Sequence, residues 1–337
     1  MRVKHATLRA YLNTAISLHL TRKLPDPTEP TFLKEDLITP LLQAVQSFEE
    51  VKNRKEIIHD SMVATMLKMA KLSPAHSLDS AILDWVLLGR FTGARRSEWC
   101  QDGSGIEMTT PNLAHETPQP KAFTLEDFTF YDSSGTRLYD VSPSHAQSVD
   151  IVEIRWRFQK NKDNGQKIPF KRDYDRPDIC PVLASLRIVL RAQALNVPSN
   201  VPLAVYAHPS RPSNYQHITA SQVVKFLRRS AKSTFNLRSN DKLLKQWTCH
   251  SIRVTAANLL HRANMSDSYI QTRLRWKSNT FLTYLRNSFY SADQHTEAMK
   301  ISNANLPHIY TSDGLRYRVL EDHEIFFTKQ ASAAGAA

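Results

Sequence analysis

The run from Cys249 to Arg253 opens the segment that most constrains how this chain folds. After it, apolar and small residues recur at helical spacing, and Asn264 is a plausible left-handed stop for the helix. His250 and Arg253 are three positions apart, so a helix places them on one face. A further helix is expected next, because Ser266 is a good N-terminal cap. The chain therefore presents a histidine and an arginine together at the start of a helix.

Such a pair suits the binding of a phosphodiester. Attack on phosphorus adds negative charge to the non-bridging oxygens, and a planar guanidinium stays charged and can donate to two oxygens at once. A second arginine follows the apolar helical run AILDWVLLGRFTGARRSE at 81–98, which ends with Arg95 and Glu98. Downstream, Trp276 precedes Tyr284, whose hydroxyl can serve as a nucleophile. The sequence thus supplies two phosphate-binding arginines and a candidate tyrosine nucleophile.

The order T-G-x-R-x-S-E, then H-x-x-R, then Trp and then Tyr resembles the catalytic signature of the tyrosine recombinase (phage integrase) family. Trp in place of the commoner second His resembles the Cre-like branch and eukaryotic Crypton-type elements. The 26-residue interval from His250 to Trp276 also agrees with the family. The resemblance implies that Arg95 and Arg253 bind the phosphate and that His250 is a general acid or base. It implies that Trp276 packs and hydrogen-bonds at the phosphate, that Tyr284 is the nucleophile and that Glu98 is a supporting carboxylate.

The position of the nucleophile departs from the common family pattern. Tyr284 follows Trp276 by eight residues, one fewer than the usual step. Leu285 stands at the usual position and cannot attack phosphorus. Tyr269 and Tyr290 are the other nearby hydroxyls, and both fit the order less well. Tyr284 is therefore the predicted nucleophile.

A β-hairpin is predicted within 150–170. Val152, Ile154 and Trp156 alternate with polar residues, as in a half-buried strand, and Asn164-Gly165 is a strong turn signal. In the family a hairpin lysine protonates the leaving 5′ oxygen, and Lys160 is the best positional match here. Lys162 is the next candidate and Lys167, on the return strand, is a weaker one. Apart from Lys160, the basic residues of this hairpin that are expected to contact DNA are Arg155, Arg157, Lys162 and Lys167.

Composition is consistent with a polyanionic partner. Lysine and arginine number 44 against 32 acidic residues, a formal net charge of +12. The three cysteines have no paired spacing, so neither a disulfide framework nor a zinc site is expected, and no other cofactor is implied. No apolar run is long enough to span a bilayer and no signal-peptide pattern opens the chain. An intracellular protein working with DNA is expected, in the nucleus of a eukaryote or the cytoplasm of a bacterium.

The expected fold is mainly α with a small antiparallel β-sheet (α+β). Helical periodicity at 6–20, 33–45 and 60–70 suggests a helical core-binding domain over residues 1–73, which looks truncated at its N-terminus. A break at Leu72-Ser73-Pro74 marks the predicted linker. The catalytic domain is expected over 77–310, with a surface insertion at 101–148 that carries a short strand near 123–131. Residues 311–337 are expected to form a tail.

The resemblance implies a site-specific DNA recombinase or integrase that cleaves and rejoins strands through a 3′-phosphotyrosine intermediate without a metal. Four copies acting on two duplexes would be the assembly. Two other functions stay open: a decayed or domesticated element that only binds DNA, and a type IB topoisomerase-like enzyme.

Overall fold

The computed structural model describes residues 5–29, 33–47, 54–102, 105–110, 117–159 and 163–285. These residues form helices around a four-stranded antiparallel sheet, with a second sheet of two strands. The expected α+β class is confirmed. The predictions for Lys160, Lys162, Tyr290 and the tail at 311–337 concern positions outside the described residues.

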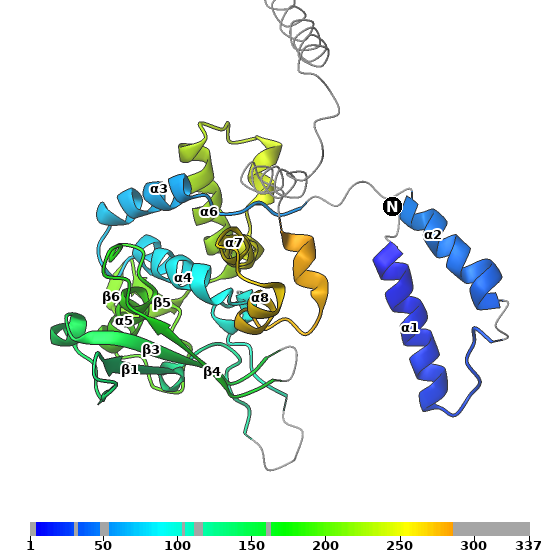
Figure 1. Cartoon of the computed structure of the whole chain (residues 1–337), viewed down its shortest axis with the longest axis horizontal. Helices are drawn as coiled ribbons and strands as arrows, with labels where there is room; N and C mark the ends of the chain where they lie inside the picture. The colour runs from blue at the N-terminus through cyan, green and yellow to red at the C-terminus, as the bar shows by residue number, and fades with distance from the viewer. Residues whose placement is uncertain are drawn as a thin grey trace, which may run out of the picture.

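The N-terminal helices form a lobe that stands apart from the main body in Figure 1. It consists of α1 (His5–Thr21), the π-helix η1 (Leu33–Ile38) and α2 (Thr39–Ser47). The helices α1 and α2 pack against each other, and α1 buries none of its residues. The first two predicted helical segments are therefore present, but they share no core with the rest of the described chain.

Helix α3 (Asp60–Lys71) belongs to the main body instead. It packs on α4 and α6, and Met62, Val63 and Met66 lie in the same hydrophobic core as α4. The break after Lys71 exists, as predicted, but it lies within one continuous core. The expected domain boundary at residues 73 to 77 must therefore be moved to between α2 and α3, because the apolar face of α3 has its partners in the main body.

The helix α4 (Leu78–Thr92) lies in the middle of the main body (Figure 1). Its residues are buried along almost its whole length. It packs against α5 (Pro181–Ala194) on one side and α7 (Cys249–Arg262) on the other. Gly89 allows the contact with α7, because a Cβ atom there would collide with Ile252 Cγ2. The close approach of α4 and α7 brings the two predicted arginine segments together.

The four-stranded sheet has the order β2-β1-β3-β4, formed by β1 (Phe128–Asp132), β2 (Arg137–Leu138), β3 (Val149–Trp156) and β4 (Gln166–Lys171). The predicted hairpin is β3 and β4, with Ile154 opposite Ile168. Val152, Ile154 and Trp156 are buried, as their alternation predicted. Gly165 takes a φ of +84° at the turn, where the left-handed backbone favours glycine.

The predicted insertion at 101–148 is only partly a surface elaboration. Its second half supplies β1, which pairs with β3 in the middle of the sheet, and the 3-10 turns η3 (Leu125–Asp127) and η4 (Pro143–Ala146). Phe123 and Phe128 pack against Trp85 of α4. The expected surface character is wrong for this half, because its aromatic residues complete the core between α4 and the sheet.

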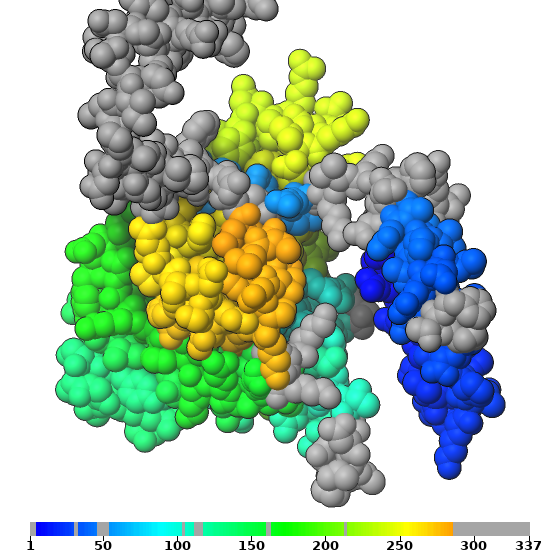
Figure 2. All heavy atoms as spheres, turned by 45° about the vertical axis from the view of Figure 1, so that its right-hand side comes forward, coloured from blue at the N-terminus to red at the C-terminus, as the bar shows by residue number. Residues whose placement is uncertain are grey.

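The remaining elements complete the main body. They are β5 (Val205–His208), β6 (Arg211–His217), α6 (Ala220–Thr234), η5 (Lys242–Gln246), α8 (Asp267–Arg273) and η6 (Asn279–Tyr284). The predicted helix signals are confirmed: Asn264 takes a φ of +58° after α7, and the Ser266 hydroxyl accepts a hydrogen bond from the Tyr269 N–H. Figure 2 shows η6, in orange, at the surface beside α8.

Candidate active site

A cavity of about 720 Å³ lies between the end of α4, the start of α6, the start of α7 and the segment that leads into η6. Five of the predicted catalytic residues line it. The tertiary structure thus brings together positions that are up to 189 residues apart in the chain, namely Arg95, His250, Arg253, Trp276 and Tyr284.

Arg253 forms the buried floor of this cavity. Only 4% of its surface is exposed. Its two terminal nitrogens donate to the backbone carbonyls of Gly93 and Leu274, and its guanidinium carbon lies 3.9 Å from the centroid of the Trp276 ring. Since a guanidinium has five N–H donors, these two bonds fix its orientation without using all of its donor capacity.

Arg95 enters from the turn after α4. Gly93 ends that helix in the left-handed conformation, with a φ of +57°, and the short 3-10 turn η2 (Arg96–Glu98) begins directly after Arg95. The Arg95 Nη1 atom donates to Glu98 Oε1 at 2.8 Å, and Nη2 donates to the carbonyl of Arg275 at 3.1 Å. The side chain is held at its tip while it still lines the cavity.

Glu98 is the buried carboxylate that organises this corner. Its Oε2 atom accepts from the Arg95 backbone N–H at 2.8 Å, from Arg275 Nη2 at 3.0 Å and from Trp156 Nε1 at 3.2 Å. Burial pushes the pKa of Glu98 upwards, but Arg275, Arg95 and Arg253 outweigh burial, so the pKa ends below its ordinary value. Glu98 is therefore an ionised anchor for these arginines.

The charges here do not balance. Arg95, Arg253 and Arg275 carry three positive charges, and Glu98 is the carboxylate that pairs with two of them. Burial, followed by repulsion from Arg95 and Arg275, lowers the pKa of Arg253 to about 9. An anion in the cavity would relieve this cost, so the electrostatics favour a negatively charged ligand.

The predicted nucleophile lies at the wall of the same cavity. The Tyr284 ring packs edge-on against His250, with centroids 4.9 Å apart, and lies 5.8 Å from Trp276. Tyr284 is half-buried, and its backbone carbonyl accepts a hydrogen bond from Asn258 Nδ2 at 2.8 Å. The shorter step from Trp276 is taken up by the 3-10 turn η6, which puts Tyr284 rather than Leu285 on the cavity.

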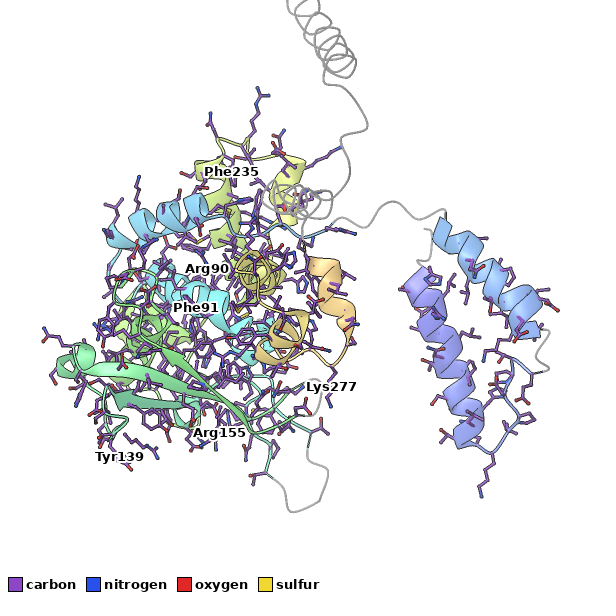
Figure 3. All side chains as sticks on the ribbon, viewed as in Figure 1. Arg90, Phe91, Tyr139, Arg155, Phe235 and Lys277 are labelled. Atoms are coloured by element: carbon purple, nitrogen blue, oxygen red, sulfur yellow. The ribbon has the colours of Figure 1, made fainter. Side chains whose placement is uncertain are left out.

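The described part of the β3–β4 hairpin reaches the rim of this site. Asp163, just before the turn, pairs with Lys277 at 3.1 Å, and Lys277 directly follows Trp276. Figure 3 shows Lys277 near this end of the hairpin. Lys167 does not line the cavity, because it pairs with Glu153 on the neighbouring strand at 3.3 Å.

The two predicted DNA-binding arginines at the end of β3, Arg155 within it and Arg157 just after it, have structural partners. Arg157 Nε donates to Asp127 at 2.9 Å, and its Nη2 atom donates to the backbone carbonyls of Pro120 and Ala122. Arg155, labelled in Figure 3, pairs with the same carboxylate at 3.4 Å. Both tie β3 to the segment before β1, and neither lines the cavity.

Two site residues escaped the sequence reasoning. Asn258 holds the backbone of Tyr284, and Arg275 holds Glu98. Asn258 lies one helical turn and a half beyond Arg253 and gave no signal, because its partner is a backbone atom remote in the chain. Arg275 directly precedes Trp276, and its left-handed backbone, with a φ of +58°, points the two side chains in different directions. Nothing in the sequence indicated this backbone conformation.

Within the residues that the structure describes, no group of His, Cys, Asp and Glu side chains is arranged to hold a metal ion. Cys100, Cys180 and Cys249 are buried and unbridged. Across the same part of the chain, no helix is both long enough and apolar enough to cross a membrane.

No protein-family model matches the chain, and no curated protein matches it. Among solved structures it is similar to an XerA recombinase, with 13% identity and a TM-score of 0.38 over 88% of this chain and 83% of that one. It is also similar to the XerH site-specific recombinase bound to its difH substrate, with 13% identity and a TM-score of 0.39 over 88% and 70%. For a lambda integrase dimer bound to a COC′ core site the values are 15% and 0.40, over 84% and 80%. These neighbours are recombinases and an integrase, but at such low likeness the function proposed below depends on the cavity itself.

Proposed function

We propose that this protein is a site-specific DNA recombinase or integrase that breaks and rejoins DNA through Tyr284. The observation that carries the proposal is the excess of buried positive charge around Arg253, with a tyrosine hydroxyl on the same cavity. If these arginines formed only a structural ion-pair network, its positive and negative charges would be expected to balance. This cluster instead favours an anion beside a nucleophile.

The proposed reaction is a transesterification at phosphorus. The Tyr284 oxygen forms a bond to the scissile phosphate as the bond to the 5′ oxygen breaks, which leaves a 3′-phosphotyrosine link. The proton lost from the tyrosine hydroxyl is balanced by the proton gained by the 5′-hydroxyl. In the rejoining step a 5′-hydroxyl attacks the phosphotyrosine and Tyr284 recovers its proton. Neither step consumes a nucleotide, an oxidant or a reductant.

The roles follow from position in the cavity. Arg95 and Arg253 would bind the non-bridging oxygens, where charge develops. His250, in contact with the Tyr284 ring, would take the phenolic proton or orient the phosphate. Trp276 would cover the phosphate from the side of Arg253. We further propose that Lys160 protonates the leaving oxygen, with Lys162 as the alternative, since the adjoining Asp163 is anchored to Lys277 at the rim.

The proposed partner is double-stranded DNA, bound by four copies of the chain on two duplexes inside the cell. The domains proposed for this task are the N-terminal lobe of α1 and α2, which would contact DNA, and the main body, which would hold the reaction.

A trapped-adduct assay tests the proposal. The probe is a pool of DNA duplexes of random sequence, each with a nick beside the position to be cleaved, so that the short 5′-hydroxyl fragment is lost and the covalent complex accumulates. The wild type is expected to enrich one family of duplexes as denaturant-stable adducts, with mass spectrometry placing the DNA on Tyr284. Tyr284→Phe should bind the enriched duplex and form no adduct, while Tyr269→Phe, on the exposed face of α8, should behave as wild type.

The other outcomes identify the rival functions. Specific DNA binding without any adduct would indicate a decayed, DNA-binding protein. Adducts on single duplexes together with relaxation of supercoiled DNA, but no exchange between sites, would indicate a topoisomerase. An adduct on a residue other than Tyr284 would overturn the assignment of the nucleophile.

A further inference from the structure

Arg275 is the most buried arginine near the cavity, yet it does not line it. Its side chain is completely buried. The Nη1 atom donates to the Thr92 carbonyl at 3.0 Å, Nη2 donates to Glu98 Oε2 at 3.0 Å, and the guanidinium carbon lies 4.0 Å from the centroid of the Trp156 ring. Arg275 can therefore act on a ligand only through the residues that it holds and through the field of its charge, which also lowers the pKa of Arg253.

The strained backbone of Arg275 directs its side chain away from that of the adjacent Trp276. Its φ of +58° lies in the left-handed region, which is costly for a residue with a Cβ atom and cheap for glycine. In this conformation its side chain enters the core towards Glu98, whereas Trp276 lines the cavity. An arginine at such a position indicates that its guanidinium has a task, because glycine would take the same backbone without the cost.

That task can be read from how Glu98 is shared. Arg95 Nη1 binds Oε1, while Oε2 accepts from Arg275 Nη2 in addition to the Arg95 backbone N–H and Trp156 Nε1, so Arg275 is the charged donor on that oxygen. An arginine facing a carboxylate with both oxygens accessible tends to form two parallel hydrogen bonds. With Oε2 already bound, Arg95 makes one side-chain bond to Glu98, and its Nη2 atom turns instead to the Arg275 carbonyl.

We propose that Arg275 is a positioning residue that competes with Arg95 for Glu98 and so keeps the Arg95 guanidinium directed at a phosphate in the cavity. It acts in two ways. First, it prevents Arg95 from forming a bidentate pair with Glu98. Second, its positive charge neutralises Glu98, so that Glu98 does not neutralise the charge of the arginines that line the cavity. This inference rests on the proposed phosphate chemistry of the cavity.

The test uses the full chain and two readouts. The first is the affinity for inorganic phosphate, followed on the indole N–H resonance of Trp276, which is assigned with the Trp276→Phe variant. The second is the rate of adduct formation on the enriched nicked duplex. Arg275→Gln should weaken phosphate binding about tenfold and slow adduct formation at least as much, the loss expected when one charge-assisted hydrogen bond is misplaced. Arg275→Lys keeps the charge beside Glu98 but loses the contact with the Trp156 ring, so it should lose less than Arg275→Gln in both readouts.

A rescue separates positioning from folding. The double variant Glu98→Gln/Arg275→Gln removes the carboxylate together with its competitor, so Arg95 is free again and the excess of positive charge returns. Phosphate affinity should recover to within about threefold of wild type. Arg273→Gln is the matched control, since Arg273 lies over the Phe170 ring at the surface and donates to the Pro169 carbonyl.

The outcomes are distinguishable. A folded double variant that binds phosphate as poorly as Arg275→Gln, or an Arg275→Gln variant that equals Arg273→Gln in both readouts, would overturn the inference. If wild type forms no adduct but the phosphate affinities follow the expected order, the proposed strand exchange fails while the positioning role of Arg275 stands.

Discussion

The guanidinium of Arg253 lies over the ring of Trp276, with 3.9 Å between the guanidinium carbon and the ring centroid. The contact joins the buried arginine of α7 to Trp276, at the position where the family that the sequence resembles more often has a histidine. It places an electron-rich face against a charge that burial makes costly. Trp276 therefore stabilises the cation that a phosphate would meet.

Replacing Trp276 tests this contact. Trp276→Leu keeps an apolar side chain but has no π-face, and a desolvated cation–π contact is worth roughly 2 kcal/mol, or about thirtyfold in rate. Adduct formation on the enriched duplex should fall by about that factor, whereas Trp276→Phe should remain within about fivefold of wild type. If phenylalanine loses as much as leucine, the indole N–H rather than the ring face is what matters.

The pH dependence of stability should reveal the ionised Glu98. Its pKa in the folded protein is below the value of the unfolded chain, so its stabilising effect is complete above the unfolded value and disappears as pH falls through the folded one. At neutral pH, Glu98→Gln should lower the free energy of unfolding by about 3–5 kcal/mol, because it leaves buried arginines without their partner.

Urea unfolding from pH 7 to pH 3 measures this effect. The difference between wild type and Glu98→Gln should shrink as the pH falls through about 4.3, where half of the unfolded carboxyl is protonated. Glu126→Gln, at an exposed position of η3, is the control and should change stability little at any pH. A difference that stays constant across the range would contradict an ionised Glu98.

Asn258 should affect the chemical step more than DNA binding. Its Nδ2 atom donates to the carbonyls of Val254 and Tyr284, so it ties the nucleophile's backbone to α7. In Asn258→Leu, adduct formation should slow by about tenfold, the equivalent of one buried hydrogen bond, while the Kd for the enriched duplex stays within about threefold. Asn264→Gly, at the left-handed stop after α7, is the control and should cleave at the wild-type rate. Equal losses in binding and cleavage would argue against this role.

The contact between α4 and α7 should tolerate no added methyl group. A Cβ atom at position 89 would collide with Ile252 Cγ2, so Gly89→Ala should destabilise the protein by about 1–3 kcal/mol, measured by urea unfolding. Combining it with Ile252→Ala removes the clash, and the double variant should be less destabilised than the sum of the two changes. Strict additivity would mean that α4 can move away from α7 without cost.

Much of the local structure was predictable because its signals are local. Periodicity predicted the helix at Cys249, its stop at Asn264 and the β3–β4 hairpin, and motif order selected the five residues that meet at the cavity. The domain boundary and the surface character of β1 were predicted wrongly. In both cases an apolar face is visible in the sequence, but its partner lies in a distant part of the chain.

The sequence by itself determined which side chains can do chemistry and the order in which they occur. The tertiary structure decided which partners they have. Arg157 binds Asp127, and Glu98 binds both Arg95 and Arg275. Asn258 holds the backbone carbonyl of Tyr284. The reason is physical. A buried charge or a backbone carbonyl must be satisfied by whichever donors the fold brings within reach, and Arg157, Arg275 and Asn258 are remote in sequence from the groups that they satisfy.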